Sequence, residues 1–116
     1  MASRVKSVTG LPFSSASFDA VLFPESIGYF ELEDVMPEAR RVLRKTGRML
    51  ITAYPPGFES DSIYKTRSLA EISRQLRGCG FRVIEQLSLT VKRNAVIEVE
   101  SEKDSELLYV MARPAE

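Results

Sequence analysis

The sequence predicts an α/β fold in which helices pack on a mostly parallel sheet that ends in an antiparallel C-terminal hairpin. Two apolar runs, at residues 18–23 and 48–54, have the length of strands, and a segment with helical periodicity follows each of them. After residue 81 the pattern changes to alternation, which indicates strands alone. Strands that alternate with helices favour parallel pairing with right-handed crossovers, and the alternating tail favours a hairpin at one edge.

Three segments in the first half of the chain have the composition of strands. Residues 3–9 alternate polar and β-branched side chains and stop at Gly10, which indicates a short strand. Residues 18–23 are mostly apolar and lie between serines and Pro24, as expected of a central strand that is covered on both faces. Residues 48–54 form a second apolar run that a Pro-Pro-Gly sequence closes.

Apolar residues from Leu32 to Leu43 recur at the spacing of one helix face. Asp34 is a candidate N-cap, which would place Pro37 in the first turn, where its missing N–H costs no hydrogen bond. Gly47 is suited to a left-handed helix stop. The arginines and lysine just before this glycine would complement the helix dipole; a solvated helix face is expected there, with an anion site as the alternative.

A second helix begins at a capping box. Ser68 can accept a hydrogen bond from the backbone N–H of Glu71, and the Glu71 side chain can reach back to the backbone of Ser68. Gly78 or Gly80 is expected to end this helix.

The tail of the chain is predicted to hold three strands. Leu87, Leu89 and Val91 alternate with polar residues, so the strand that starts near residue 81 should be half-buried. Residues 95–99 and 107–113 are expected to form two more strands, joined by an acidic, exposed loop.

The composition of the 116 residues fits one small domain and excludes several classes of function. Sixteen basic and sixteen acidic side chains cancel, so neither nucleic acid nor an anionic membrane is indicated as a partner. The chain has no apolar run long enough to span a bilayer, and the single Cys79 suits a reducing, cytoplasmic location. Because histidine is absent, neither a catalytic triad nor a metal site is expected.

Four stretches resemble the class I S-adenosylmethionine-dependent methyltransferases. Residues 11–13 read Leu-Pro-Phe, residues 17–21 read Ser-Phe-Asp-Ala-Val, and residues 38–51 join Glu-Ala-Arg-Arg-Val-Leu-Arg-Lys-Thr-Gly to a hydrophobic strand. Residues 76–81 are similar to the end of the family's next helix and its Gly-Phe entry into the following strand. The four stretches lie in the family's order, so the resemblance implies the C-terminal half of a Rossmann-like methyltransferase sheet.

The resemblance also implies that the half of the domain that grips the cofactor is missing. In the family, a glycine-rich strand-to-helix turn and a later acidic residue hold S-adenosylmethionine, and this sequence begins after both. The acidic position before the Leu-Pro-Phe motif falls on Ser7, and the family's double glycine is reduced to Thr46-Gly47. S-adenosylmethionine is therefore the cofactor by resemblance only. We expect residues 1–116 to form one truncated domain that binds no cofactor alone.

Phe23, Pro24 and Glu25 are the cofactor-binding residues that the resemblance implies. They end the central strand, and in the family the loop that follows lies beside the sulfonium and the methyl acceptor. Glu25 is a candidate to orient an acceptor or to serve as a base, although an inert loop carboxylate is the alternative. No residue is assigned as catalytic.

Tyr29, Phe30, Tyr54 and Phe58 are candidate substrate-binding residues. With Tyr64 they make five of the ten aromatic residues, and all five are expected near one end of the sheet. An acceptor pocket would explain the clustering. Packing of a long loop or a contact with another protein would explain it as well.

Two functions remain open. The chain is either a methyltransferase relative whose missing half comes from another polypeptide, or a non-catalytic assembly module. In the second case the strand at residues 18–23 has lost a neighbour, so its open edge would pair with a second copy in a homodimer. Residues 3–9 would prevent this pairing if they folded over the same edge.

Overall fold

The computed structural model describes residues 12–58 and 63–116, so the strand predicted at residues 3–9 lies outside the described part. Five strands form one sheet in the order β1-β2-β5-β3-β4. Their bounds are Phe18–Pro24 for β1, Leu43–Ala53 for β2, Phe81–Lys92 for β3, Ala95–Val99 for β4 and Leu107–Pro114 for β5. β1 pairs with β2 in parallel, and the other three pairings are antiparallel. The α/β class predicted from the sequence is confirmed.

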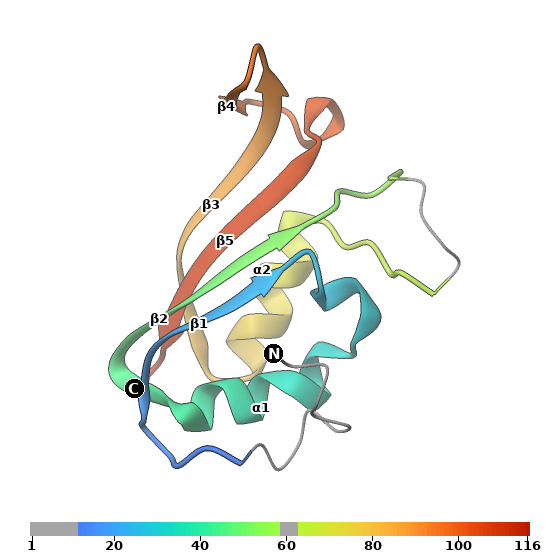
Figure 1. Cartoon of the computed structure of the whole chain (residues 1–116). Helices are drawn as coiled ribbons and strands as arrows, with labels where there is room; N and C mark the ends of the chain where they lie inside the picture. The colour runs from blue at the N-terminus through green and yellow to red at the C-terminus, as the bar shows by residue number, and fades with distance from the viewer. Residues whose placement is uncertain (1–11, 59–62) are drawn as a thin grey trace.

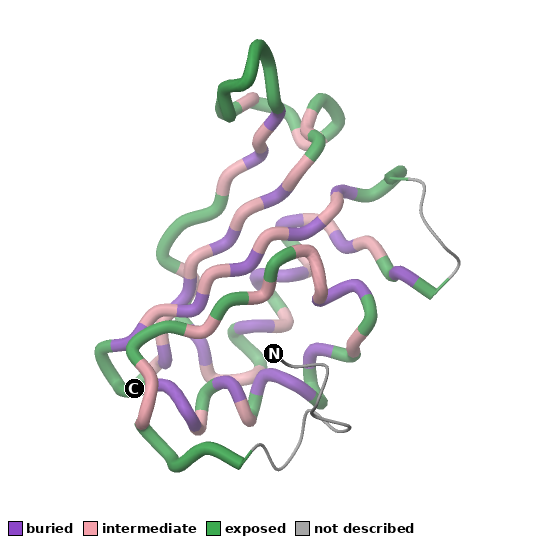
Figure 2. Tube along the Cα trace, viewed as in Figure 1, coloured by how far each residue is buried: buried purple, intermediate pink, exposed green. Residues whose placement is uncertain are grey.

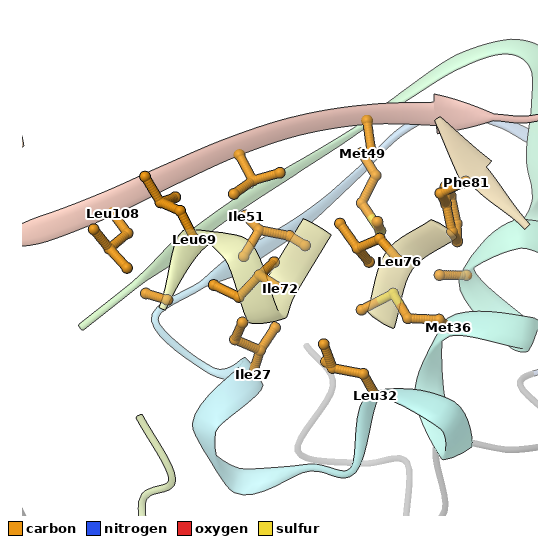
Figure 3. Close-up of a cluster of buried hydrophobic side chains, with 14 of the residues drawn as sticks. Ile27, Leu32, Met36, Met49, Ile51, Leu69, Ile72, Leu76, Phe81 and Leu108 are labelled. Carbon is orange, nitrogen blue, oxygen red and sulfur yellow. The ribbon is translucent and has the colours of Figure 1, made fainter. Parts of the chain in front are cut away.

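The two α-helices lie on the same face of this sheet (Figure 1). α1 spans Leu32–Val42 and α2 spans Leu69–Gly78, while short 3-10 helices occupy Ile27–Tyr29 (η2) and Glu102–Asp104 (η3). The hydrophobic core fills the space between the sheet and the helices (Figure 3). Its members include Met36, Ile72 and Leu76 from the helices, and Met49, Ile51, Leu108 and Val110 from the strands.

The predicted start and end of the first helix were wrong. α1 begins one turn earlier than expected, with Glu31 as the N-cap, so Asp34 lies in the first turn and Pro37 lies inside the helix. The helix ends at Val42, and β2 begins at once with Leu43. The backbone turns extended here because Leu43 is buried and pairs with Phe18 of β1, a tertiary contact that the helical pattern does not reveal.

Gly47 does not stop the helix but lets two backbones approach each other. A Cβ at this position would lie 3.0 Å from the backbone oxygen of Asp19 and 2.8 Å from a methyl of Leu43. The register between β1 and β2 shifts at this irregular start of β2. The glycine is therefore explained by close packing between strands.

The local signals after residue 65 are confirmed. Ser68 accepts a hydrogen bond from the Glu71 N–H at 3.1 Å, and the reciprocal bond to the Glu71 side chain is present. Gly80 has a φ of +89°, the left-handed conformation expected just after a helix. Arg93 and Asn94 also have positive φ and form the tight turn between β3 and β4.

Two expectations about burial were wrong. β1 is covered on one face only: Val21 and Phe23 pack against the core, whereas Leu22 is 66% exposed (Figure 2). In β3 the polar residues Ser88 and Thr90 are buried, while Val91 is exposed. The helices therefore cover one side of the sheet. Phe81 and Val83 at the start of β3 face that side, whereas the apolar residues after residue 86 face the other.

Candidate functional site

The candidate site lies where the parallel strands β1 and β2 end side by side. Pro24, the last residue of β1, pairs with Thr52 near the end of β2. The loops that follow the two strands leave from this same edge of the sheet (Figure 1). In open α/β sheets, ligands bind at the carboxyl ends of the strands. The predicted site residues on both loops therefore share one end of the sheet.

Glu25 is tied to β2 by a reciprocal network with Thr52. Its backbone N–H donates to the Thr52 carbonyl at 2.9 Å and approaches the Thr52 hydroxyl oxygen at 3.2 Å. The Thr52 hydroxyl donates in turn to the Glu25 carboxylate. Glu25 has a φ of +51°, a left-handed conformation that costs free energy in a residue with a Cβ. The carboxylate thus has a partner and a fixed position, which the sequence does not reveal.

Aromatic rings from three loop segments meet beside this network. Tyr54 and Phe58 are stacked with 3.9 Å between ring centroids, and Tyr64 lies edge-on to Tyr54 at 5.4 Å and to Tyr29 at 5.0 Å. The Tyr64 hydroxyl accepts a hydrogen bond from the Tyr54 N–H at 3.2 Å. Burial is the main reason that the pKa of Tyr64 is raised, so its hydroxyl stays protonated at neutral pH. Tyr64 is the centre of the cluster.

Gly28 and Arg67 hold the η2 segment against this cluster. Gly28 leaves room for the ring of Tyr64, which a Cβ would overlap. Arg67 is 2% exposed, and its guanidinium donates to the carbonyls of Ile27 at 2.9 Å and Phe30 at 2.7 Å. Burial lowers the pKa of Arg67. No motif in the sequence points to this arginine, which lies in a polar loop two residues after Lys65.

The other predicted site residues do not lie together in the structure. Phe23 is partly buried and packs against the hydrophobic core, whereas Pro24 is exposed at the end of β1. Phe30 contributes its carbonyl to the Arg67 bond, and its ring contacts none of the other aromatic rings within the described segments. Tyr29, Tyr54 and Phe58 are therefore the substrate-binding candidates that lie together.

A groove of about 630 Å³ lies at the end of β2. Residues 54–58, with the Tyr54–Phe58 stack, form one wall, and the other wall includes Glu102, Lys103 and Glu106. The Glu106 carboxylate accepts hydrogen bonds from the Thr90 hydroxyl and from the Val91 N–H, and these bonds lower its pKa. Glu106 is therefore ionised at neutral pH. A flat ring between an aromatic stack and a carboxylate is the kind of ligand that this groove suits.

The sheet ends at β1 in the described part of the chain. β1 is an edge strand, so its carboxyl end has β2 on one side and no strand on the other within the described segments. The glycine-rich turn that would cradle a nucleotide is not in the sequence.

Comparison with known proteins identifies the fold. Residues 1–51 match the family described as methyltransferase domain. A methyltransferase of Thermotoga maritima, a possible histamine N-methyltransferase, superposes with a TM-score of 0.76 over 92% of this chain and 61% of its own, at 20% identity. The chain has the fold of the S-adenosylmethionine-dependent methyltransferases. The resemblance predicted from the four stretches between residues 11 and 81 is thereby confirmed.

Two further structures share this methyltransferase fold at low identity. The 1,6-didemethyltoxoflavin-N1-methyltransferase of Burkholderia thailandensis, solved with its substrate and S-adenosylhomocysteine, has a TM-score of 0.72 and 16% identity over 94% of this chain and 48% of its own. The candidate methyltransferase of Haloferax volcanii, solved in complex with a methyltransferase activator, has a TM-score of 0.70 and 19% identity over 95% and 59%. No curated protein sequence matches the chain. The chain spans about half to three fifths of the length of these three relatives.

Proposed function

We propose that this chain is the acceptor-side part of an S-adenosylmethionine-dependent methyltransferase whose cofactor grip comes from another polypeptide segment. The observation that carries the proposal is the position of the Glu25–Thr52 network at the end of an edge strand. A network that fixes a loop in a left-handed conformation is costly, which suits a binding site more than a surface loop. The length of the relatives supports the presence of a further segment.

In this proposal the two sides of the site have different tasks. Phe23, Pro24 and Glu25 border the cofactor, and Tyr29, Tyr54 and Phe58 shape the pocket for the methyl acceptor. Methyl transfer depends chiefly on holding the acceptor in line with the sulfonium, so positioning and exclusion of water can supply most of the rate without a histidine. The absence of histidine is therefore compatible with this reaction.

Calorimetric titration with S-adenosylmethionine and S-adenosylhomocysteine tests the proposal. The isolated chain should give no measurable binding heat, because only one wall of the cleft is available. Addition of the polypeptide that carries the glycine-rich turn should restore binding. A micromolar dissociation constant for the isolated chain would contradict the proposal.

A second candidate function is a non-catalytic assembly module that forms a homodimer. The observation in its favour is that β1 has a neighbour on one side only among the described strands. An apolar edge strand with free N–H and C=O groups can pair with the same strand of a second copy around a two-fold axis. Such a protein would work in the cytoplasm, where the single Cys79 stays reduced.

Light scattering separates the two functions. A dimer at tens of micromolar that binds no cofactor, with or without added polypeptide, would favour the assembly module. A well-folded monomer would count against it.

None of the helices in the described part is long and apolar enough to cross a membrane.

A further inference from the structure

The sheet has one face that no helix covers among the described residues. α1 and α2 both lie on the side of Met49, Ile51 and Leu108 (Figure 1, Figure 3). The other side, which we term the open face, carries the alternate residues of the strands. Its apolar members include Leu22 of β1, Leu50 of β2, Leu87, Leu89 and Val91 of β3, and Leu107, Tyr109 and Met111 of β5.

The residue pattern of β3 indicates that the open face is a contact surface. A strand with one solvated face normally turns its polar residues to water and its apolar residues to the core. In the second half of β3 the arrangement is reversed: Ser88 is 6% and Thr90 is 7% exposed on the helix side, whereas Val91 on the open face is 57% exposed. Leu22 on β1 is likewise 66% exposed. These apolar residues are thus directed to the side that lacks a covering layer among the described residues.

Three arginines cross one end of the open face as a row, which we term the arginine row. Arg82 of β3 pairs with Arg113 of β5, and Arg48 of β2 comes next to Arg113 because Met49 pairs with Ala112. Like charges directly opposite each other on neighbouring strands are destabilising. The arginine row therefore indicates a surface that binds a negatively charged group.

The arginine row lacks a negative partner within the described part of the chain. None of the ion pairs there includes Arg48, Arg82 or Arg113. Arg48 donates only to the carbonyls of Thr46 and Gly47, at 2.9 and 3.1 Å. The Nε of Arg113 is buried and has no hydrogen-bond partner among these residues.

We infer that the open face binds an amphipathic helix whose apolar side covers Leu22, Leu50 and Met111 and whose acidic end meets the arginine row. The inference rests on the proposed function, in which another polypeptide segment completes the domain. Leu50 and Arg48 are two residues apart along β2, which separates them by about 7 Å. One to two turns of a helix span a similar distance. Acidic side chains one to two turns from the apolar side chains of the helix can therefore reach the arginine row. Carboxylates are the side chains that arginine binds in bidentate geometry.

A nucleic acid fits this surface less well. The net charge of the chain is zero, so the arginine row is a local feature and not part of a wide basic surface. The row is also continuous with the apolar residues of the open face, which phosphates would not cover. A helix with both an apolar side and an acidic end satisfies the two features together.

Binding of two labelled synthetic helical peptides tests the inference on the full chain. Both carry the same leucine side, and one has glutamates and the other lysines at the end that meets the arginine row. The glutamate peptide should bind about tenfold more tightly, as expected for three charge pairs at a surface, and the preference should shrink with added salt. Equal affinities for the two peptides, or binding of neither, would overturn the inference.

Matched variants locate the binding surface. Arg48→Gln, Arg82→Gln and Arg113→Gln combined should abolish the preference for glutamate. Arg74→Gln, Arg77→Gln and Arg93→Gln combined remove the same charge from the outer side of α2 and the β3–β4 turn and should leave the preference intact. Leu22→Ser should weaken both peptides, whereas Ile63→Ser, at a residue 72% exposed in a loop, should weaken neither. If the two triple-arginine variants lose the preference for glutamate equally, or if Leu22→Ser and Ile63→Ser weaken peptide binding equally, the inference is contradicted.

Two further outcomes are decisive. If a DNA oligonucleotide competes with the glutamate peptide at equal charge, the arginine row is a polyanion site and the helix inference fails. If Leu22→Ser instead converts a dimer to a monomer that binds no peptide, the open face is covered by a second copy and the inference fails as well. If the glutamate peptide docks and a separate calorimetric titration gives a micromolar dissociation constant for S-adenosylmethionine with the isolated chain, the proposed function fails and the open face remains a docking surface.

Discussion

Glu25 and Thr52 are joined in both directions across the two parallel strands. The backbone N–H of Glu25 donates to the Thr52 carbonyl at 2.9 Å, and the Thr52 hydroxyl donates to the Glu25 carboxylate. The strands alone would bring these residues near each other, but only the hydroxyl fixes the carboxylate. The threonine hydroxyl therefore fixes the carboxylate of the first residue after β1, whose backbone is left-handed.

Thr52→Val removes this hydroxyl without changing the shape of the side chain. We expect the free energy of unfolding to fall by about 1 kcal/mol, since one hydrogen bond to a charged group is lost from a partly exposed site. Urea denaturation measures the change. Thr46→Val, at an exposed threonine of the same strand, is the control and should stay within about 0.5 kcal/mol of the parent. Equal effects of the two substitutions would mean that the network contributes nothing.

The carboxylate of Glu106 makes stability depend on pH. Its pKa is lowered first by the hydrogen bond from the Thr90 hydroxyl and then by the Val91 N–H. A pKa below that of the unfolded chain means that the contribution is present above the unfolded pKa and is lost as the pH falls through the folded one. The parent protein should therefore lose more stability between about pH 5 and about pH 3 than Glu106→Gln does.

Denaturation midpoints at several pH values check this expectation. Glu100→Gln, in the exposed loop before η3, is the matched control, and its pH profile should follow that of the parent. Identical profiles for the parent and Glu106→Gln would contradict the assignment.

The sequence predicts local structure well, but it predicts poorly which side chains of a strand face the core. The capping box at Ser68 depends on atoms three residues apart, and the β3–β4 turn on Asn94 and its neighbour, so both could be seen in the sequence. The end of α1 could not, because Leu43 leaves the helix to pair with a strand that precedes it in the chain. Which side of β3 is buried depends on where the helices pack, which alternation alone does not state.

The candidate site was predictable to a similar degree. The strand ends and the aromatic residues in the sequence are enough to place Tyr29, Tyr54 and Phe58 at one end of the sheet. The bond between Glu25 and Thr52 and the buried position of Arg67 could not be predicted, because each depends on contacts between residues far apart in the sequence.

Arg67 should be the most sensitive charged residue near the site. It is 2% exposed and satisfies the carbonyls of Ile27 and Phe30, so Arg67→Leu leaves two acceptors without a donor. We expect a loss of about 3 kcal/mol in the free energy of unfolding, measured by urea denaturation. Arg67→Lys should retain part of this stability.

Arg74→Leu is the control for this loss. Arg74 is exposed on α2, so the same change of side chain there should alter stability by less than about 0.5 kcal/mol. A small effect at both arginines would show that water replaces the guanidinium of Arg67 at no cost.

Gly28 and Tyr64 should be coupled because the ring occupies the space of a Cβ at position 28. Gly28→Ala forces the ring to move and should cost about 1–3 kcal/mol, as overpacking of a filled site does. In a Tyr64→Leu background the same substitution should cost much less, and a double-mutant cycle by urea denaturation gives the difference as the coupling free energy. Gly78→Ala, which has open space at the end of α2, should instead be neutral or stabilising. If Gly28→Ala costs the same with and without the tyrosine, the ring does not set the requirement for glycine, and the η2 backbone itself must do so.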